Sequence, residues 1–345
     1  MQDYQFKIGK EVTSTQRKAN FVNVTDAPYG DKSLGYSLLL PNSWAFDTIE
    51  AESAELPSGI LKPLSIFLGP GNKESHCYFQ LFGMKLVRDV RAVHWYVNYT
   101  KENNYTVLKT NELSHLFIDA IAEKEISGVK FVFRQVTRVD RDRLFFFQFF
   151  APESIYGEFE DSFGLGVASF KLDDEDATKT VEARTAYELG RVLSFQLPAS
   201  WAKGAQSDDG LLVDCLNTNS ENEIAGWLRF QVLPQAKDEE LLKIVGTQLA
   251  KSDVKFGKQI SEQGVGGEPI RSNRTGSDRT FFAAIESNDI VQEVRIVTFP
   301  LSDSETMAVS LVGPSRTHDF VTWAINQRGI EIACESVQLA KQNPP

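Results

Sequence analysis

The residue types that most often carry chemistry in proteins are sparse and scattered in this sequence. The four histidines are His76, His94, His115 and His318, and none has a second histidine, a cysteine or a carboxylate at a ligand spacing that recurs in the other half of the chain. Zinc sites on helices use pairs such as HxxxH or HExxH, and neither pattern occurs. We therefore expect structural histidines and no bound metal.

The remaining candidate motifs also favour structural roles. The cysteines Cys77, Cys215 and Cys334 are odd in number and lie in apolar stretches, where a free cysteine is usually a small buried hydrophobe. The glycine-rich stretch at 264–269 lacks the lysine and the helix start of a phosphate-binding loop, and the acidic run at 173–176 lacks the glycine of a calcium loop. With no Gly-x-Ser-x-Gly elbow either, we expect no cofactor and no enzyme activity. Whether Cys215 and Cys334 pair stays open.

The composition is typical of a folded protein of two domains. The chain has 345 residues, 42% of them apolar, and this length suits two domains of about 150 residues each. No run approaches the roughly 18 apolar residues of a membrane-spanning helix. The formal net charge of −11 is divided into −2 in residues 1–172 and −9 in residues 173–345. Because an acidic surface repels phosphate backbones and no dense basic patch is present, we expect no nucleic-acid binding.

One corner motif occurs twice. Residues 38–44 read LLLPNSW and residues 195–201 read FQLPASW, so an apolar run ends in Pro-x-Ser-Trp in both places. Strand-like runs follow each corner, and the triplet FQL at 79–81 is matched to FQV at 230–232. Alternating or continuous apolar runs of this kind are typical of strands with a buried face.

Later landmarks keep the same order in both halves. An amphipathic helix is predicted after Asp89 and after Asp238, with each aspartate as the N-cap. A hairpin with a polar tip follows at 130–152 and at 290–314, and a final helix ends each half. Six landmarks in one order at similar spacing indicate a duplicated domain.

We therefore divide the chain into four segments. Residues 1–33 form an N-terminal extension without a counterpart, residues 34–172 a first domain, residues 173–188 an acidic linker, and residues 189–340 a second domain. Each domain is expected to be of the α+β class, with an antiparallel β-sheet flanked by α-helices. Whether the extension adds a strand or reaches over a neighbour is open.

This order of landmarks resembles the PsbP-like superfamily, which includes photosystem PsbP, Ran-binding Mog proteins, DcrB-type lipoproteins and Eag-type chaperones of type VI secretion. In the first copy the resemblance is carried by Leu40, Pro41, Trp44, the strand RLFFFQFFAP and the end VASFK. In the second copy it is carried by Leu197, Pro198, Trp201, MAVSLVGP and ESVQL, with Val337 in place of the usual phenylalanine. The resemblance implies two tandem sheets with flanking helices, used chiefly to bind other macromolecules, and it transfers no particular partner.

Two sets of residues are candidate sites. The stretch HWYVNY (94–99) places aromatic side chains around a helix whose valines already form an apolar stripe, which favours an exposed protein interface. The interface candidates are Trp95, Tyr96 and Tyr99, and the structural corners are Pro41, Trp44, Pro198 and Trp201. Packing of the aromatic residues beneath the extension or the second copy is the open alternative.

The missing catalytic motifs and the duplication favour a non-catalytic protein-binding module, a scaffold or chaperone in a bacterial envelope or secretion assembly. The alternative is an enzyme or small-molecule-binding protein with a cleft between the copies, lined by Arg134, His94 or Asp140. The start QDYQF is typical of a mature exported chain and favours a periplasmic location, whereas the unpaired cysteines favour the cytoplasm. The compartment, the partner and the oligomeric state stay open.

Overall fold

The computed structural model describes residues 4–7, 13–47, 49, 53–70, 77–176, 179–190, 193–260, 276–285 and 288–339. His76 and the glycine-rich stretch at 264–269 lie outside these residues. The chain divides into two compact units, Met1–Val87 with Arg91–Val181, and Arg88–Val90 with Glu182–Pro345. We refer to them as the first and the second unit and describe each by itself.

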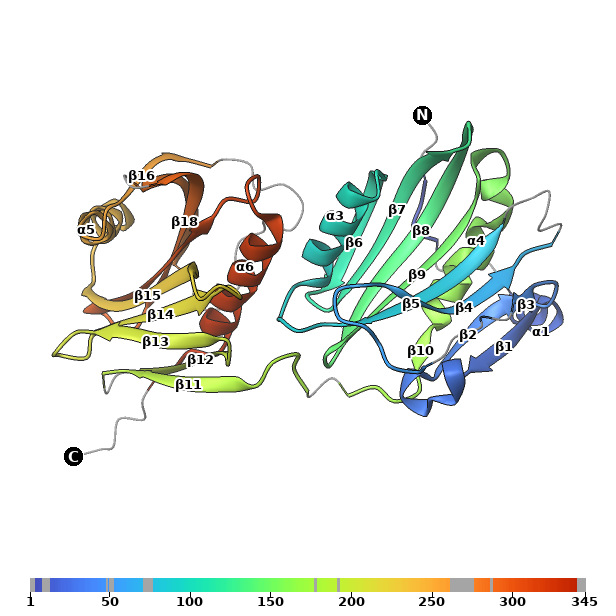
Figure 1. Cartoon of the computed structure of the whole chain (residues 1–345), viewed down its shortest axis with the longest axis horizontal. Helices are drawn as coiled ribbons and strands as arrows, with labels where there is room; N and C mark the ends of the chain where they lie inside the picture. The colour runs from blue at the N-terminus through green and yellow to red at the C-terminus, as the bar shows by residue number, and fades with distance from the viewer. Residues whose placement is uncertain are drawn as a thin grey trace. The chain divides into compact units, whose positions relative to one another are not determined.

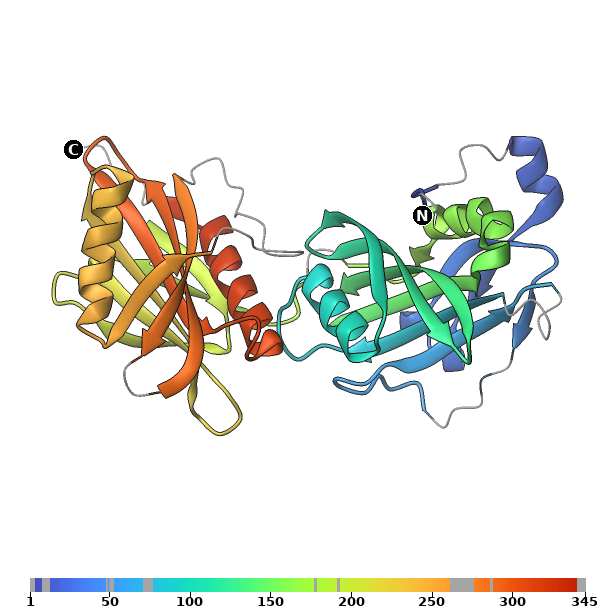
Figure 2. The same ribbon diagram turned by 90° about the horizontal axis from the view of Figure 1, so that it is seen from above.

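The first unit is built from strands and helices in the order α1 (Ser14–Asn20), β1 (Phe21–Asp26), η1 (Pro28–Gly30), η2 (Lys32–Leu34), β2 (Tyr36–Pro41), β3 (Ala45–Asp47), β4 (Lys62–Leu68), β5 (Tyr78–Lys85), α3 (Ala92–Glu102), β6 (Thr106–Ser114), β7 (Phe117–Ile126), β8 (Val129–Asp140), β9 (Arg143–Pro152), α4 (Glu153–Ser169) and β10 (Lys171–Leu172). Its seven-stranded antiparallel sheet has the order β3-β4-β5-β9-β8-β7-β6, and a three-stranded sheet has the order β1-β2-β10. Helix α3 packs on β6, β7 and β8, and α4 packs on β2, β8 and β9. Figure 1 and Figure 2 show the two helices on opposite faces of the large sheet.

The second unit has the order β11 (Arg184–Leu189), β12 (Leu193–Pro198), β13 (Trp201–Gln206), β14 (Leu212–Thr218), β15 (Ile224–Pro234), α5 (Asp238–Ala250), β16 (Val254–Gln259), β17 (Ser277–Ile285), β18 (Asn288–Pro300), β19 (Glu305–Pro314), α6 (Phe320–Glu335) and β20 (Gln338–Leu339). Its large sheet runs β13-β14-β15-β19-β18-β17-β16 and its small sheet β11-β12-β20. Helix α5 packs on β16 and β19, and α6 on β12, β15 and β19. The α+β class with two antiparallel, helix-flanked units is confirmed.

The two units share their strand order and their register. Ala45 lies opposite Leu68, and Ala202 lies opposite Leu216, each directly after the corner tryptophan of its unit. The final helices are also attached alike, because a serine at the end of each helix, Ser169 or Ser336, accepts a hydrogen bond from a backbone N–H of the preceding small-sheet strand at 2.8 Å. The two units therefore agree in strand order and in these contacts.

The small sheets correct the expected boundaries. In β1, Phe21 lies opposite Pro41, and in β11, Arg184 lies opposite Pro198. The extension at residues 1–33 therefore contains a strand with a counterpart, contrary to the expectation that it has none. Strand β11 likewise begins inside the segment expected to be a linker, because its backbone pairs with the apolar strand that follows.

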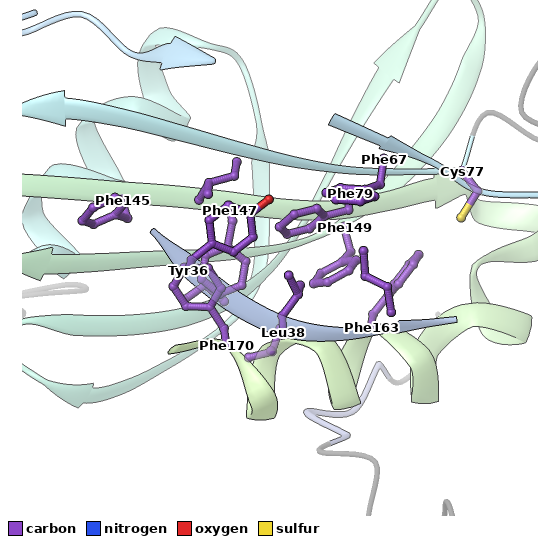
Figure 3. Packing of buried hydrophobic residues seen from close by; sticks show 14 of the residues in the cluster. Tyr36, Leu38, Phe67, Cys77, Phe79, Phe145, Phe147, Phe149, Phe163 and Phe170 are labelled. Atoms are coloured by element: carbon purple, nitrogen blue, oxygen red, sulfur yellow. The ribbon is translucent and has the colours of Figure 1, made fainter. Parts of the chain in front are cut away.

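Phenylalanines fill the core of the first unit between the large sheet, β2 and α4 (Figure 3). Phe79 of β5 packs on Phe149 of β9 with ring centroids 4.7 Å apart, and Phe149 stacks on Phe163 of α4 at 5.1 Å. Phe147 packs on Phe170 at 4.4 Å. Such ring pairs add specific geometry to the burial of a large apolar area. Strand β9 reads as an apolar run interrupted only by Gln148, because helices pack on both faces of the sheet (Figure 1).

Three global properties concern the described residues only. None of their helices is both long and apolar enough to span a membrane. Among them there is also no group of three or more His, Cys, Asp or Glu side chains placed to hold a metal ion. The cysteines Cys77, Cys215 and Cys334 are buried free thiols, so Cys215 and Cys334 do not pair in this structure.

Candidate functional site

The three aromatic residues predicted as an interface do not share one environment. Tyr96 is fully buried, and its hydroxyl donates a hydrogen bond to Gln135 Oε1 at 2.9 Å. Trp95 and Tyr99 are half-buried and stack on each other with centroids 5.2 Å apart, against Phe146 of β9. The interface prediction is therefore wrong for Tyr96, because its side chain is inside the unit. For Trp95 and Tyr99 it stays a prediction.

Tyr96 begins a row of hydrogen bonds that crosses the large sheet. Gln135 Nε2 donates to Gln148 Oε1, and Gln148 Nε2 donates to Gln80 Oε1, both at 3.0 Å. The three glutamines lie directly opposite one another on β8, β9 and β5. Because these buried amides bond to one another, the row fixes the register of the central strands.

The corner tryptophans pack within their own units. Trp201 is 1% exposed, and its ring lies so close to α6 that a Cβ at Gly329 would be 2.7 Å from Cζ2. Trp44 is half-buried and meets the rings of Phe149 and Phe163 edge-on, with both centroid distances 6.3 Å. Pro41 and Pro198 end the strands before them, as described above.

The residues named for a cleft between the copies are buried and lie apart. Arg134 and His94 are 0% exposed and Asp140 is 3% exposed. Asp140 accepts hydrogen bonds from Arg141 and Arg143 at the tip of the β8–β9 hairpin. His94 belongs to α3, whereas Arg134 faces α4 on the opposite side of the sheet. The three do not form one catalytic constellation.

Arg134 instead forms a buried bidentate ion pair with Asp119 of the neighbouring strand. Nε lies 3.1 Å from Oδ1 and Nη2 lies 2.8 Å from Oδ2. This fork uses two of the five guanidinium donors. Nη1 faces α4 at Gly164 and donates to the backbone carbonyl oxygen of Lys7. A buried donor without an acceptor costs free energy, so the Lys7 carbonyl oxygen stabilises this buried ion pair by accepting from Nη1.

The N-terminal segment (residues 4–7) reaches this centre along α4, and Figure 2 shows the N-terminal end of the chain beside that helix. Lys109 Nζ donates to the backbone carbonyl of Tyr4 at 3.2 Å, and Glu160 Oε1 accepts from the backbone N–H of Gln5 at 3.3 Å. Together with the bond from the buried arginine, three charged side chains thus contact main-chain atoms of Tyr4, Gln5 and Lys7. The backbone N–H of Lys7 also donates to the carbonyl oxygen of Gln5 at 2.9 Å, so the segment turns at Phe6. Contacts to main-chain atoms do not depend on the side chains of the segment.

Side chains at both ends of the segment are bound as well. Tyr4 is 8% exposed, meets Tyr156 edge-on at 5.5 Å, and donates its hydroxyl hydrogen to Glu153 at 3.1 Å. Burial, followed by this hydrogen bond, raises the pKa of Tyr4 to about 12. Lys7 Nζ lies 3.1 Å from Glu160, and that hydrogen bond raises the pKa of Lys7. The segment is therefore held by a phenol at one end and an ammonium at the other.

A glycine makes room for the segment. A Cβ at Gly164 would lie 2.6 Å from the carbonyl carbon of Lys7, closer than real Cβ contacts allow. Glycine within a helix costs about 1 kcal/mol relative to alanine, and here the close approach of a second main chain explains it. We name this site the segment slot, formed by Lys109, Arg134, Glu153, Tyr156, Glu160 and Gly164.

The second unit repeats the ion pair at the equivalent position. Arg295 Nε lies 2.9 Å from Asp278 Oδ1, and Nη2 lies 2.6 Å from Oδ2. In both units the aspartate lies opposite the residue two positions after the arginine. Both pairs are almost completely shielded from solvent.

The second unit, however, closes its slot from within. Counted from the serines at the ends of the two helices, Ser169 and Ser336, Gln327 of α6 corresponds to Glu160 and Glu331 corresponds to Gly164. Gln327 Oε1 accepts from Nη1 of Arg295, and Glu331 is 5% exposed. Side chains of the helix thus stand where the first unit admits a backbone segment.

The sequence analysis named Arg134 as a residue of a cleft between the copies and did not identify its partners, Asp119 and the backbone of Lys7. Asp119 precedes Arg134 by 15 residues and Asp278 precedes Arg295 by 17, in the same arms of equivalent hairpins, and this repeated pair was the available signal. Residues 4–7 carry no such signal, because their partners are more than 100 residues away.

No protein-family profile matches this chain, and no curated protein is similar to it by sequence. Among solved structures it is similar to cyanobacterial PsbP (CyanoP) from Synechocystis sp. PCC 6803, with 11% identity, a TM-score of 0.32, and 45% of this chain and 93% of that chain covered. It is also similar to the immunity protein TplEi of the T6SS from Pseudomonas aeruginosa, with 8% identity, a TM-score of 0.20, and 94% and 98% covered. The Tle4–Tli4 complex has 8% identity, a TM-score of 0.21, and 94% and 99% covered. These TM-scores are too low to assign a family or a function.

Proposed function

We propose that the protein is a non-catalytic protein-binding module whose first unit holds a short protein segment in the segment slot. The observation that supports this most directly is that Lys109, Arg134 and Glu160 contact backbone atoms of residues 4–7. Two donors for carbonyls and one acceptor for an N–H match groups that the main chain of any segment presents. Because Arg134 is fully buried, its hydrogen bond to a carbonyl is protected from competing water.

The two units would have arisen by duplication and then diverged in this function. Their shared strand order, register and buried ion pair support a common origin. In the second unit Gln327 already accepts from the buried arginine, so we assign segment binding to the first unit alone. A scaffold or chaperone role in a bacterial envelope or secretion assembly is the setting that we propose from the PsbP-like sequence resemblance.

Two glycine variants of α4 test the slot. Gly164→Glu fills it, because a Cβ there already meets the main chain of Lys7, whereas a Cβ at Gly157 meets nothing within 4 Å, so Gly157→Glu adds the same charge outside it. A displayed library of random peptides is selected against the full chain carrying Tyr4→Ala and Lys7→Glu, which weaken its own segment. We expect enriched peptides that still bind after Gly157→Glu and no longer bind after Gly164→Glu. No enrichment, or equal binding to both glycine variants, contradicts the proposal.

A further inference from the structure

We propose that residues 4–7 are a built-in ligand of the segment slot, and that a partner segment must displace them. The partner segment has the same chemistry: it turns at its third position as residues 4–7 do, with a tyrosine at its first position and a lysine or arginine three residues later. This inference rests on the proposed function and adds to it a preferred partner sequence and a means of control.

The fold itself does not need a backbone segment at this position. In the second unit, Gln327 accepts the hydrogen bond from Arg295, and Glu331, at the position that corresponds to Gly164, is buried beside Arg328 at 3.1 Å. A side chain on α4 would therefore have sufficed to complete the centre around Arg134. The first unit instead keeps an opening of the size of a main chain.

The segment is attached in a way that permits its release. It has no strand pairing, since residues 4–7 belong to neither sheet. Its contacts come from side chains of α4, β6 and β8, and the side chain of Lys7 is 33% exposed. Segments without ladder hydrogen bonds open at a small fraction of the global unfolding free energy.

The charges around the slot define the partner. Glu153 accepts from the hydroxyl of Tyr4, while Glu160 and Asp161 lie 3.1 and 3.6 Å from Lys7 Nζ. The first position of a bound segment therefore favours a phenol that donates a hydrogen bond. The fourth position favours a cation, because it faces two carboxylates.

The built-in segment also leaves one group of the slot unused. Tyr156 is fully buried beside Tyr4, and its hydroxyl has no hydrogen-bond partner within the described part of the chain. A partner that supplies one more polar group here gains a hydrogen bond that residues 4–7 do not make. The built-in ligand is thus a competitor that a better-fitting segment can replace.

Tethering sets the strength of this competition. A segment that belongs to the same chain as its slot acts at a high effective concentration, so a free segment binds with an affinity reduced by the fraction of slots that are closed. Weakening the built-in segment should therefore strengthen the binding of a free one. If residues 4–7 had only a structural role, weakening their contacts would not strengthen the binding of a free segment.

The probe is a fluorescent peptide of sequence QDYQFKIG, titrated by anisotropy into four full-length proteins. These are the wild type, the double variant Tyr4→Ala with Lys7→Glu, and the double variant combined with either Gly164→Glu or Gly157→Glu. We expect the peptide to bind the double variant at least about tenfold more tightly than the wild type, because the slot is then open. Gly157→Glu should preserve this binding and Gly164→Glu should abolish it. A peptide with glutamate in place of its lysine should bind the double variant about tenfold more weakly, from loss of a charge-assisted contact.

The possible outcomes separate this inference from the proposed function. If library peptides bind the double variant but QDYQFKIG does not, the built-in ligand is refuted and segment binding stands. If QDYQFKIG binds the wild type and the double variant equally, there is no competition and the inference is also refuted. If no peptide of any sequence binds, both fail. A wild-type dimer that Tyr4→Ala dissociates would show exchange of the segment between copies and would overturn the inference.

Discussion

Single and paired replacements of Asp119 and Arg134 test how the buried ion pair stabilises the first unit. Arg134→Met leaves a buried carboxylate without its cation, and Asp119→Leu leaves the guanidinium without its anion. Each single loss is expected to cost about 3–5 kcal/mol of unfolding free energy. Replacing both residues removes two charges from the interior, an exchange that is often close to neutral. The double variant still loses about 1–3 kcal/mol, because the backbone carbonyl of Lys7 no longer has a hydrogen-bond donor.

The expected coupling energy follows from these values. Each single variant is expected to lose about 3 kcal/mol or more, and the double variant about 2 kcal/mol. The sum of the two single losses therefore exceeds the loss of the double variant by at least about 3 kcal/mol, even at the low end of the range. The equivalent pair, Asp278→Leu with Arg295→Met, should behave alike, since Gln327 there takes the place of the backbone carbonyl.

Urea unfolding followed by tryptophan fluorescence measures these losses, because both units contain tryptophans. A chain of two units need not unfold in one step. Variants of the Asp278 pair identify the transition of the second unit, and variants of the Asp119 pair should shift the other transition. Single variants that each cost under about 1 kcal/mol, or a double variant whose loss equals the sum of the singles, would refute the reasoning.

Further predictions concern the cores. Trp201→Ala should cost about 3–5 kcal/mol, and Trp44→Ala less, because Trp44 is only half-buried; thermal unfolding checks the order. Cys77 and Cys215 should resist alkylation at about pH 8 until the chain unfolds, because burial raises both thiol pKa values to about 12; rapid native labelling contradicts this. Gln148→Leu should cost about 2 kcal/mol by leaving its two glutamine neighbours unsatisfied, and an unchanged urea midpoint would count against the row.

The sequence predicts the strands better than it predicts their alignment between the units. Phe79 lies opposite Phe149 and Leu228 lies opposite Leu311, and both partners stand three residues before the proline that ends their strand. The counterpart of Phe79 is therefore Leu228, whereas the sequence match had paired it with Phe230. A shift of two residues returns every side chain to the same face, so hydrophobic alternation does not detect it.

The prediction that Tyr96 is exposed was wrong because it took the buried face of the helix to be narrower than it is. A helix on a sheet buries a stripe at least about 100° wide, and Tyr96 lies three residues after Val93, on the same face. The valines alone account for only part of this stripe. Tyr96 enters the core because Gln135 accepts from its hydroxyl, a partner on β8 that no local pattern in the helix reveals.

The slot could not be predicted, because its parts meet only through the tertiary fold. Lys109 contacts Tyr4 across 105 residues, and Glu160 contacts Gln5 across 155. Gly164 is one of several glycines in α4, and sequence alone does not distinguish the one that admits a backbone from Gly157, which faces open space. The repeated Asp-to-Arg pair can be found in the sequence, but whether it serves as a structural centre or as part of a binding site depends on the side chains of the helix that covers it.

That helix explains how one framework can serve two purposes. An arginine held by an aspartate through Nε and Nη2 keeps Nη1 as a buried donor, and the fold must supply an acceptor for it. In the second unit Gln327 is that acceptor, so the centre is complete within the unit. In the first unit the acceptor is the carbonyl of Lys7, a group that any protein segment can provide equally well. Different side chains on the covering helix, around the same ion pair, are thus enough to turn a structural centre into a binding site. For this physical reason we assign the binding of a protein segment to the unit that contains Gly164.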